Sequence, residues 1–168
     1  MIAGLILSDD VEEECSLAFL GEELETMQVN TNEEIVEEVE KREPEVLAVD
    51  VGTEQSQQEF TKEENELKEE GYIFTPNSHQ QRKVERMQSL ERHLEHKMGG
   101  MIEIIRFEPQ ITAKELAIDS ERDLSSIGVE GDIGGVGEFD ATLGAVTARF
   151  YSQGQFEDYG VVVPESVS

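Results

Sequence analysis

Apolar runs open the chain and predict strands. Residues 2–8 are almost uninterrupted in their apolar character, which is typical of a strand buried on both faces. Two further runs, residues 15–20 and 24–29, follow at short spacing, and Gly21-Glu22-Glu23 between them suits a hairpin loop. The connections are too short for crossovers. We therefore expect three strands that form an antiparallel meander.

Helical and strand patterns alternate in the rest of the chain. The predicted helices cover residues 32–43, 61–70, 79–98, a short stretch capped by Thr112 and Glu115, and 138–151, while residues 45–50, 101–107 and 159–163 are strand-like. Helical crossovers should place the strands at 45–50 and 101–107 parallel to the first strand. The pattern predicts an α/β fold: one mixed sheet of three antiparallel opening strands and two further parallel strands, with helices on both faces.

Length and composition narrow the class of protein. A chain of 168 residues with 37% apolar residues is expected to form a single domain, residues 1–168. No apolar run approaches the roughly 20 residues that span a bilayer, and Met1 leads into a strand rather than a signal peptide. Cys15 is the only cysteine, so no disulfide can form within the chain. These features favour a cytoplasmic protein without a membrane partner.

The formal net charge is -26, from 39 acidic and 13 basic residues. An acidic surface of this density suits either a cationic partner or a high-salt environment, in which salt screens the repulsion between carboxylates. The acidic residues are dispersed along the chain rather than gathered in a tail, which favours the halophilic interpretation. A nucleic acid would then approach only through salt screening and a local basic surface.

Carboxylates follow the predicted parallel strands. The first strand runs into Asp9 and Asp10, the strand at 45–50 ends at Asp50, the strand at 101–107 is followed by Glu108, and Asp140 lies at the start of the last helix. Ligands of open α/β sheets bind outside the carboxyl ends of strands, so we expect these side chains to converge. Oxygen ligands of this kind suit Mg²⁺ or Mn²⁺, and two such ions can clamp a phosphodiester.

A simpler interpretation exists for each of these acids. Asp9 and Asp10 are favoured as a solvated turn, and Asp140 is also explained as a charge near a helix N-terminus. Asp50 and Glu108 are stronger candidates, because each directly follows an apolar strand and should be partly buried.

The helix at 79–98 is the most basic segment. Arg82, Lys83 and Arg86 lie near its start, and Arg82 and Arg86 are neighbours on one helical face. They either bind the phosphates of a nucleic acid or pair with the acidic residues of the same helix, Glu85, Glu91 and Glu95.

Four segments resemble a known family: AGLILS (3–8), VLAVDVG (46–52), RFEPQIT (106–112) and FDATLGAVTARFY (139–151). In this order they are similar to the four signature blocks of the domain-of-unknown-function family 429, whose members are predicted nucleases with a ribonuclease-H-like fold. The resemblance implies that Asp50, Glu108 and Asp140 match the family's acidic positions and serve as catalytic and metal-binding residues. It also implies Mg²⁺ or Mn²⁺ as the cofactor and leaves homodimerisation open, with no segment that marks an interface.

The first block departs from the family, because Ile6 stands where the family has an aspartate two residues after a glycine. One hypothesis is a metal-dependent nuclease in which Asp9 or Asp10 supplies the missing ligand. The second is a catalytically silent module that binds nucleic acid or a protein partner. A third is an actin-like phosphotransferase arrangement of the same fold, for which the chain offers no nucleotide-binding loops.

Overall fold

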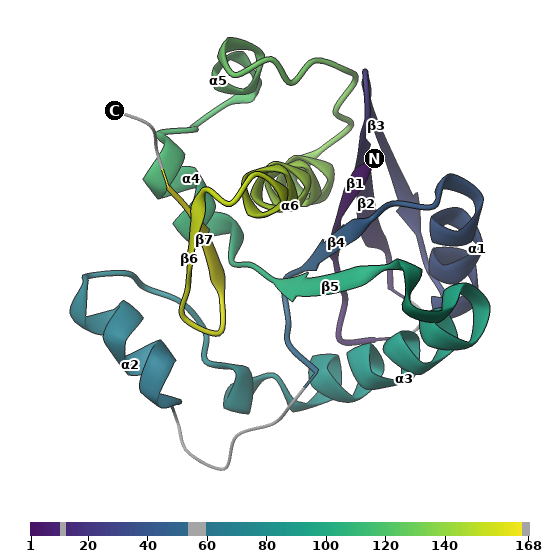
Figure 1. The fold of residues 1–168 in the computed structure, drawn as a ribbon, viewed down its shortest axis with the longest axis horizontal. Coiled ribbons are helices and arrows are strands. Elements are labelled where there is room, and N and C mark those ends of the chain that lie inside the picture. The colour runs from purple at the N-terminus through teal and green to yellow at the C-terminus, as the bar shows by residue number, and fades with distance from the viewer. Residues whose placement is uncertain (11–12, 54–59, 166–168) are drawn as a thin grey trace.

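The computed structural model describes residues 1–10, 13–53 and 60–165, and a five-stranded mixed sheet lies at its centre (Figure 1). The strands are β1 (Ile2–Ile6), β2 (Cys15–Leu20), β3 (Leu24–Val29), β4 (Val46–Val49) and β5 (Glu103–Arg106), in the spatial order β3-β2-β1-β4-β5. β1 is antiparallel to β2, and β2 to β3. β4 is parallel to both β1 and β5. The predicted topology is confirmed.

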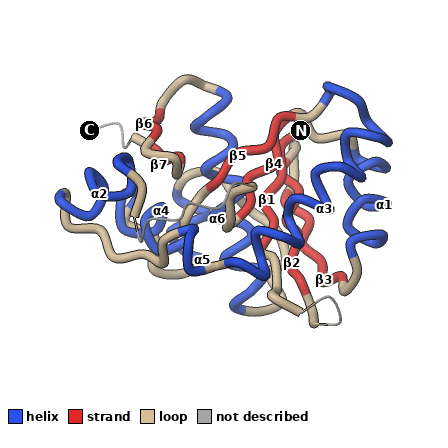
Figure 2. The backbone as a smooth tube through the Cα atoms, turned by 90° about the horizontal axis from the view of Figure 1, so that it is seen from below, coloured by secondary structure: helices blue, strands red, loops and turns tan. Residues whose placement is uncertain are grey.

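Helices cover both faces of this sheet (Figures 1 and 2). α1 (Asn32–Arg42) and α3 (Gln81–Met98) lie on one face, and α6 (Val136–Ser152) lies on the other. Alternate residues of β1 serve the two layers, since side chains of a strand alternate between its faces. Ala3, Leu5 and Leu7 pack with α1 and α3, whereas Ile2 and Ile6 pack on the side of α6.

Small residues bring α6 directly onto β1. A Cβ atom added to Gly4 would lie 2.0 Å from the carbonyl oxygen of Ala141, and one added to Gly144 would lie 2.6 Å from the ring of Phe107. No side chain fits at either position without moving the helix. The Ala- and Gly-rich stretch of α6 therefore serves contact with its own sheet, and it fixes the helix that carries Asp140.

The remaining elements are short, and most of them lie beyond the carboxyl end of β5 (Figure 1). They are α2 (Lys62–Glu69), the single turns Asn77–His79 and Gly99–Met101, α4 (Pro109–Leu116), α5 (Glu121–Ser126), and the hairpin of β6 (Phe156–Asp158) and β7 (Val162–Pro164). Leu67, Ile111, Val161 and Val163 join α2, α4 and the hairpin in a small apolar cluster. In the part of the chain described, no helix is both long and apolar enough to cross a membrane.

Local predictions were wrong at three places. α4 begins at Pro109, so Thr112 is no cap; its buried hydroxyl lies 2.7 Å from the hydroxyl of Thr147 on α6. The strand-like run 159–163 is the turn and second strand of a hairpin, whose first strand is polar and only three residues long. α6 begins at Val136, two residues before the predicted start, so Asp140 lies beyond its first turn.

Candidate functional site

Asp50 is held in place at the carboxyl end of β4. One carboxylate oxygen, Oδ1, accepts a hydrogen bond of 3.0 Å from the backbone N–H of Leu7, at the end of neighbouring β1. The other, Oδ2, forms an ion pair of 2.8 Å with Nζ of Lys83 on α3. Asp50 is 8% exposed, and this burial raises the pKa of its carboxyl group, while Lys83 and the Leu7 N–H act in the opposite direction.

Glu108 and Asp140 lie close enough to Asp50 for the three charges to interact. Burial first, and then the charge of Asp50, raise the pKa of Glu108 to about 7; the charge of Asp140 adds to this rise, and Arg106 and Lys83 oppose it. Burial and the charge of Asp50 also raise the pKa of Asp140. Three acids that are far apart in sequence thus interact electrostatically within one half-buried region.

Ile6 occupies the last position of β1, on the face that α6 covers. It pairs in register with Ser16 of β2, and a Cβ atom added to Gly137 of α6 would lie 2.5 Å from the hydroxyl of Ser16. The first turn of α6 therefore lies over this end of β1 and β2. Ile6 is half-buried and packs against the apolar cluster beneath α6.

Two observations test whether these residues fit a divalent ion. The donors are all carboxylate oxygens, which is the chemistry that Mg²⁺ and Mn²⁺ require. Within residues 1–10, 13–53 and 60–165, however, no three Asp, Glu, His or Cys side chains are gathered closely enough to hold one ion. Lys83 instead neutralises Asp50. The donor chemistry fits a metal, but the ligand set is incomplete while Lys83 remains bound to Asp50.

Asp9, Asp10 and Arg86 belong to a different arrangement. Arg86 is 5% exposed, and its guanidinium donates to the carbonyl oxygens of Ser8 and Asp10 at 2.9 Å and of Asn30 at 2.8 Å. It thus ties α3 to the loops that follow β1 and β3. The hydrogen-bond donors of Arg86 are occupied inside the protein, so its side chain is not available to bind phosphate. Asp9 and Asp10 are exposed on this loop, in the position of a solvated turn.

Arg82 and Lys83 differ in position although they are adjacent. Arg82 is exposed at the start of α3, whereas Lys83 is half-buried against Asp50. Of the three basic residues that the sequence singled out, Arg82 is therefore the one with an exposed side chain.

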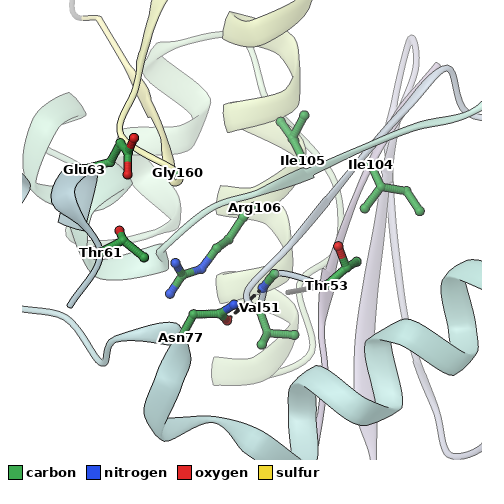
Figure 3. A pocket seen from close by; sticks show the side chains of 10 residues that line it. Val51, Thr53, Thr61, Glu63, Asn77, Ile104, Ile105, Arg106 and Gly160 are labelled. Carbon is green, nitrogen blue, oxygen red and sulfur yellow. Dashed lines mark hydrogen bonds between the residues drawn. The ribbon is translucent and has the colours of Figure 1, made fainter. Parts of the chain in front are cut away.

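A pocket of about 370 Å³ adjoins the acids and was not predicted (Figure 3). Its lining comes from the segments after β4, the start of α2, β5 and the β6–β7 turn: Val51, Gly52, Thr53, Thr61, Glu63, Asn77, Ile104, Ile105, Arg106 and Gly160. Arg106 forms an ion pair of 2.9 Å with Glu64, whose side chain is 1% exposed. Arg106 was recognisable as the one cation in the apolar run 101–107, and Glu64 as the last residue of the capping-box pattern Thr61-Lys62-Glu63-Glu64, although neither pattern indicated that the two would pair.

Burial opposes ionisation of Glu64, yet the pKa of this carboxyl group is lowered. Hydrogen bonds from the backbone N–H of Thr61, from Arg106 and from the backbone N–H of Asn77 outweigh the burial. Glu64 is therefore a fixed anion beneath the pocket. It joins α2 to β5 and to the turn that begins at Asn77.

The fold has solved counterparts, although no family model matches the chain and no curated protein matches it either. RuvC of Thermus thermophilus superposes with a TM-score of 0.54 at 13% sequence identity, over 97% of this chain and 98% of that one. The same protein in complex with a Holliday junction substrate gives a TM-score of 0.54 at 17% identity, over the same shares of the two chains. Identities this low establish the architecture only. Together with the strand order and the helices on both faces, they show that the chain has a ribonuclease-H-like fold.

Proposed function

We propose that this protein hydrolyses phosphodiester bonds of nucleic acid at the site formed by Asp50, Glu108 and Asp140. The observation that carries the proposal is the burial of Glu108 beside the charges of Asp50 and Asp140, which together raise its pKa to about 7. Buried carboxylates with perturbed pKa values are enriched at catalytic sites. The likeness to RuvC, which was solved with a Holliday junction substrate, points to structured or branched nucleic acid. Family 429, whose signature blocks four segments resemble, consists of predicted nucleases, which agrees with hydrolysis but does not specify the substrate.

The residues suggest a division of labour. Glu108, with its pKa near neutrality, would accept the proton of an attacking water, since a general base works best when its pKa lies close to the working pH. Asp50 is oriented by the Leu7 N–H and by Lys83. Arg82, exposed at the start of α3, would contact a neighbouring phosphate.

A divalent ion is part of the proposal, with Asp50 and Asp140 as its ligands and Glu108 beside them as the base. When bound, Mg²⁺ or Mn²⁺ would lower the pKa of a water molecule and offset the charge of the phosphate. Binding would require Lys83 to release Asp50, because the two are paired at 2.8 Å. We therefore expect Lys83→Ala to bind Mn²⁺ more tightly than the wild type, by about tenfold, which corresponds to about 1.4 kcal/mol. Arg92→Ala, on an exposed part of α3, is the matched control.

The test of the proposal is cleavage of a labelled four-way DNA junction with Mn²⁺ in high salt, which screens the repulsion from a net charge of -26. We expect Asp50→Asn, Glu108→Gln and Asp140→Asn, combined, to reduce the rate at least about 100-fold, the lower range for loss of a general base. The control carries the same change of charge at three exposed positions: Glu22→Gln, Glu37→Gln and Asp119→Asn. Equal rates for the two triple variants would refute the proposal.

Ile6 and the Lys83–Asp50 ion pair favour a second candidate, a catalytically silent module that binds nucleic acid or a protein partner. An internal cation already balances one acid, and the end of β1 lacks a carboxylate. This candidate predicts a retarded junction in a mobility assay without cleavage and without Mn²⁺ binding. It also predicts that Ile6→Asp introduces measurable Mn²⁺ binding, and an unchanged Ile6→Asp variant would count against it.

A further inference from the structure

We infer that the pocket beside the acids is a subsite for a single unpaired nucleobase. This inference rests on the proposed function and specifies its substrate as a nucleic acid with an unstacked base next to the reacting phosphate. The pocket and the acids share their supporting segments. Val51 and Gly52 directly follow Asp50, and Arg106 precedes Glu108 by two residues. At about 3.3 Å per residue of extended chain, the two sites are neighbours on the scale of one nucleotide.

Arg106 has one buried hydrogen-bond donor, Nε, without an acceptor among the described residues. Its side chain is 8% exposed, its Nη1 is 2.9 Å from Glu64, and its Nη2 is 3.4 Å from the carbonyl oxygen of Thr75, beyond the usual length. A buried donor without an acceptor carries a free-energy cost, because it has lost its hydrogen bonds to water. Because Arg106 lines the pocket, a small adjustment of its guanidinium toward an acceptor on a ligand would remove this cost.

The charges around the pocket favour a base over a phosphate as that acceptor. Glu64 already balances the charge of Arg106, and Glu63 adds a negative charge to the wall. Asp50 and Glu108 lie just beyond. A phosphate would be repelled, whereas a neutral base meets no such barrier. Bases also carry the ring-nitrogen and carbonyl acceptors that arginine recognises.

In Figure 3 the guanidinium of Arg106 points toward Thr61 and Asn77. Ile104, which is partly exposed, adds apolar surface, and Asn77, Thr53 and Thr61 add polar side chains, a mixture that suits the ring and the edges of a base. The volume of about 370 Å³ lies at the lower end of the range for ligand pockets, which suits one base. A base inside a duplex cannot enter such a pocket until it is extruded from the stack.

The first experiment is an NMR titration of the ¹⁵N-labelled protein with guanosine, adenosine, cytidine, uridine and, separately, ribose 5-phosphate. We expect at least one nucleoside to shift the Arg106 Nε–H signal together with the amides of Gly52 and Gly160, and ribose 5-phosphate to leave them unchanged. Equal shifts with ribose 5-phosphate would identify a phosphate subsite and overturn the inference. The absence of any nucleoside-induced shift would overturn it as well.

The variant for this titration must not leave a buried charge alone. Arg106→Gln combined with Glu64→Gln removes both partners of the ion pair, and we expect it to remain folded and to bind the nucleoside at least tenfold more weakly. Arg92→Gln, on an exposed part of α3, should bind as the wild type does. Unchanged nucleoside affinity in the folded double variant would overturn the role of Arg106 and with it the inference.

The closing experiment separates this inference from the proposed function. Two labelled duplexes are compared, one fully paired and one with a single bulged nucleotide. We expect the bulged duplex to be cleaved at least tenfold faster, next to the bulge. Equal cleavage of both would overturn the inference and leave the proposed function intact. Cleavage of neither, with the nucleoside-induced shifts retained, would refute hydrolysis and support the pocket as a binding site for a base.

Discussion

Replacing Glu108 by glutamine should change how stability depends on pH. The pKa of Glu108 is raised from its usual 4.5 to about 7 in the folded protein, chiefly by burial and by the charge of Asp50. The native state thus favours the protonated form. Stabilisation from this group is fully present below about pH 4.5 and is lost as the pH rises through about 7. Between about pH 5 and about pH 8 the loss is roughly 2.5 kcal/mol, since each pKa unit corresponds to 1.36 kcal/mol.

Glutamine keeps the shape of the side chain but does not ionise. We therefore expect Glu108→Gln and the wild type to unfold at similar denaturant concentrations near pH 5, and the variant to be more stable by roughly 2–3 kcal/mol near pH 8. Urea unfolding at the two pH values and constant high salt measures this difference. Glu45→Gln, at an exposed residue just before β4, should follow the wild type at both. Parallel behaviour of Glu108→Gln and wild type would show that Glu108 is not buried beside other acids.

Three further predictions concern packing and charge. Gly4→Ala should lower the free energy of unfolding by about 3 kcal/mol, because the new methyl group would lie 2.0 Å from a backbone oxygen of α6. Gly100→Ala, whose methyl group would have nothing within 4 Å, should lower it by less than about 1 kcal/mol. Equal losses of the two variants in urea unfolding would contradict the contact. Arg106→Ala should lower the free energy of unfolding by about 3–5 kcal/mol, because it leaves the charge of Glu64 buried without its cation. The double variant with Glu64→Gln should recover most of this stability, and no recovery would contradict the ion pair. Raising the KCl concentration from about 0.2 to about 2 M should raise the melting temperature, since salt screens the charge of -26; a lower melting temperature would contradict the halophilic interpretation.

The sheet could be predicted because its signal is local. β1, β4 and β5 are apolar runs separated by helical patterns, so both parallel pairings followed from connection length. The hairpin of β6 and β7 gave a weaker signal, because each strand has three residues and β6 is largely exposed. Thr112 was misassigned as a cap because its role is tertiary: its hydroxyl meets Thr147 across two helices.

Only part of the candidate site was predictable, because some of its features depend on tertiary contacts that leave no local signal in the sequence. Asp50 and Glu108 follow buried strands, and topology alone brings strand ends to one edge. Spacing within a helix could not distinguish Lys83, paired with Asp50, from Arg86, which is buried against loop carbonyls. That distinction depends on how α3 lies on the sheet. The chain has 39 acidic residues, so residue type alone could not single out these three acids; what distinguishes them is their burial and their neighbours in the structure.

The account depends on Asp50, Glu108 and Asp140 forming one interacting cluster. The most direct measurement is the titration of the Glu108 carboxyl carbon by NMR in the wild type and in Asp140→Asn. We predict a midpoint near 7 in the wild type and a lower one in the variant, because burial and neighbouring negative charges raise the pKa of Glu108. A wild-type midpoint near 4.5, or one that Asp140→Asn leaves unchanged, would contradict the cluster.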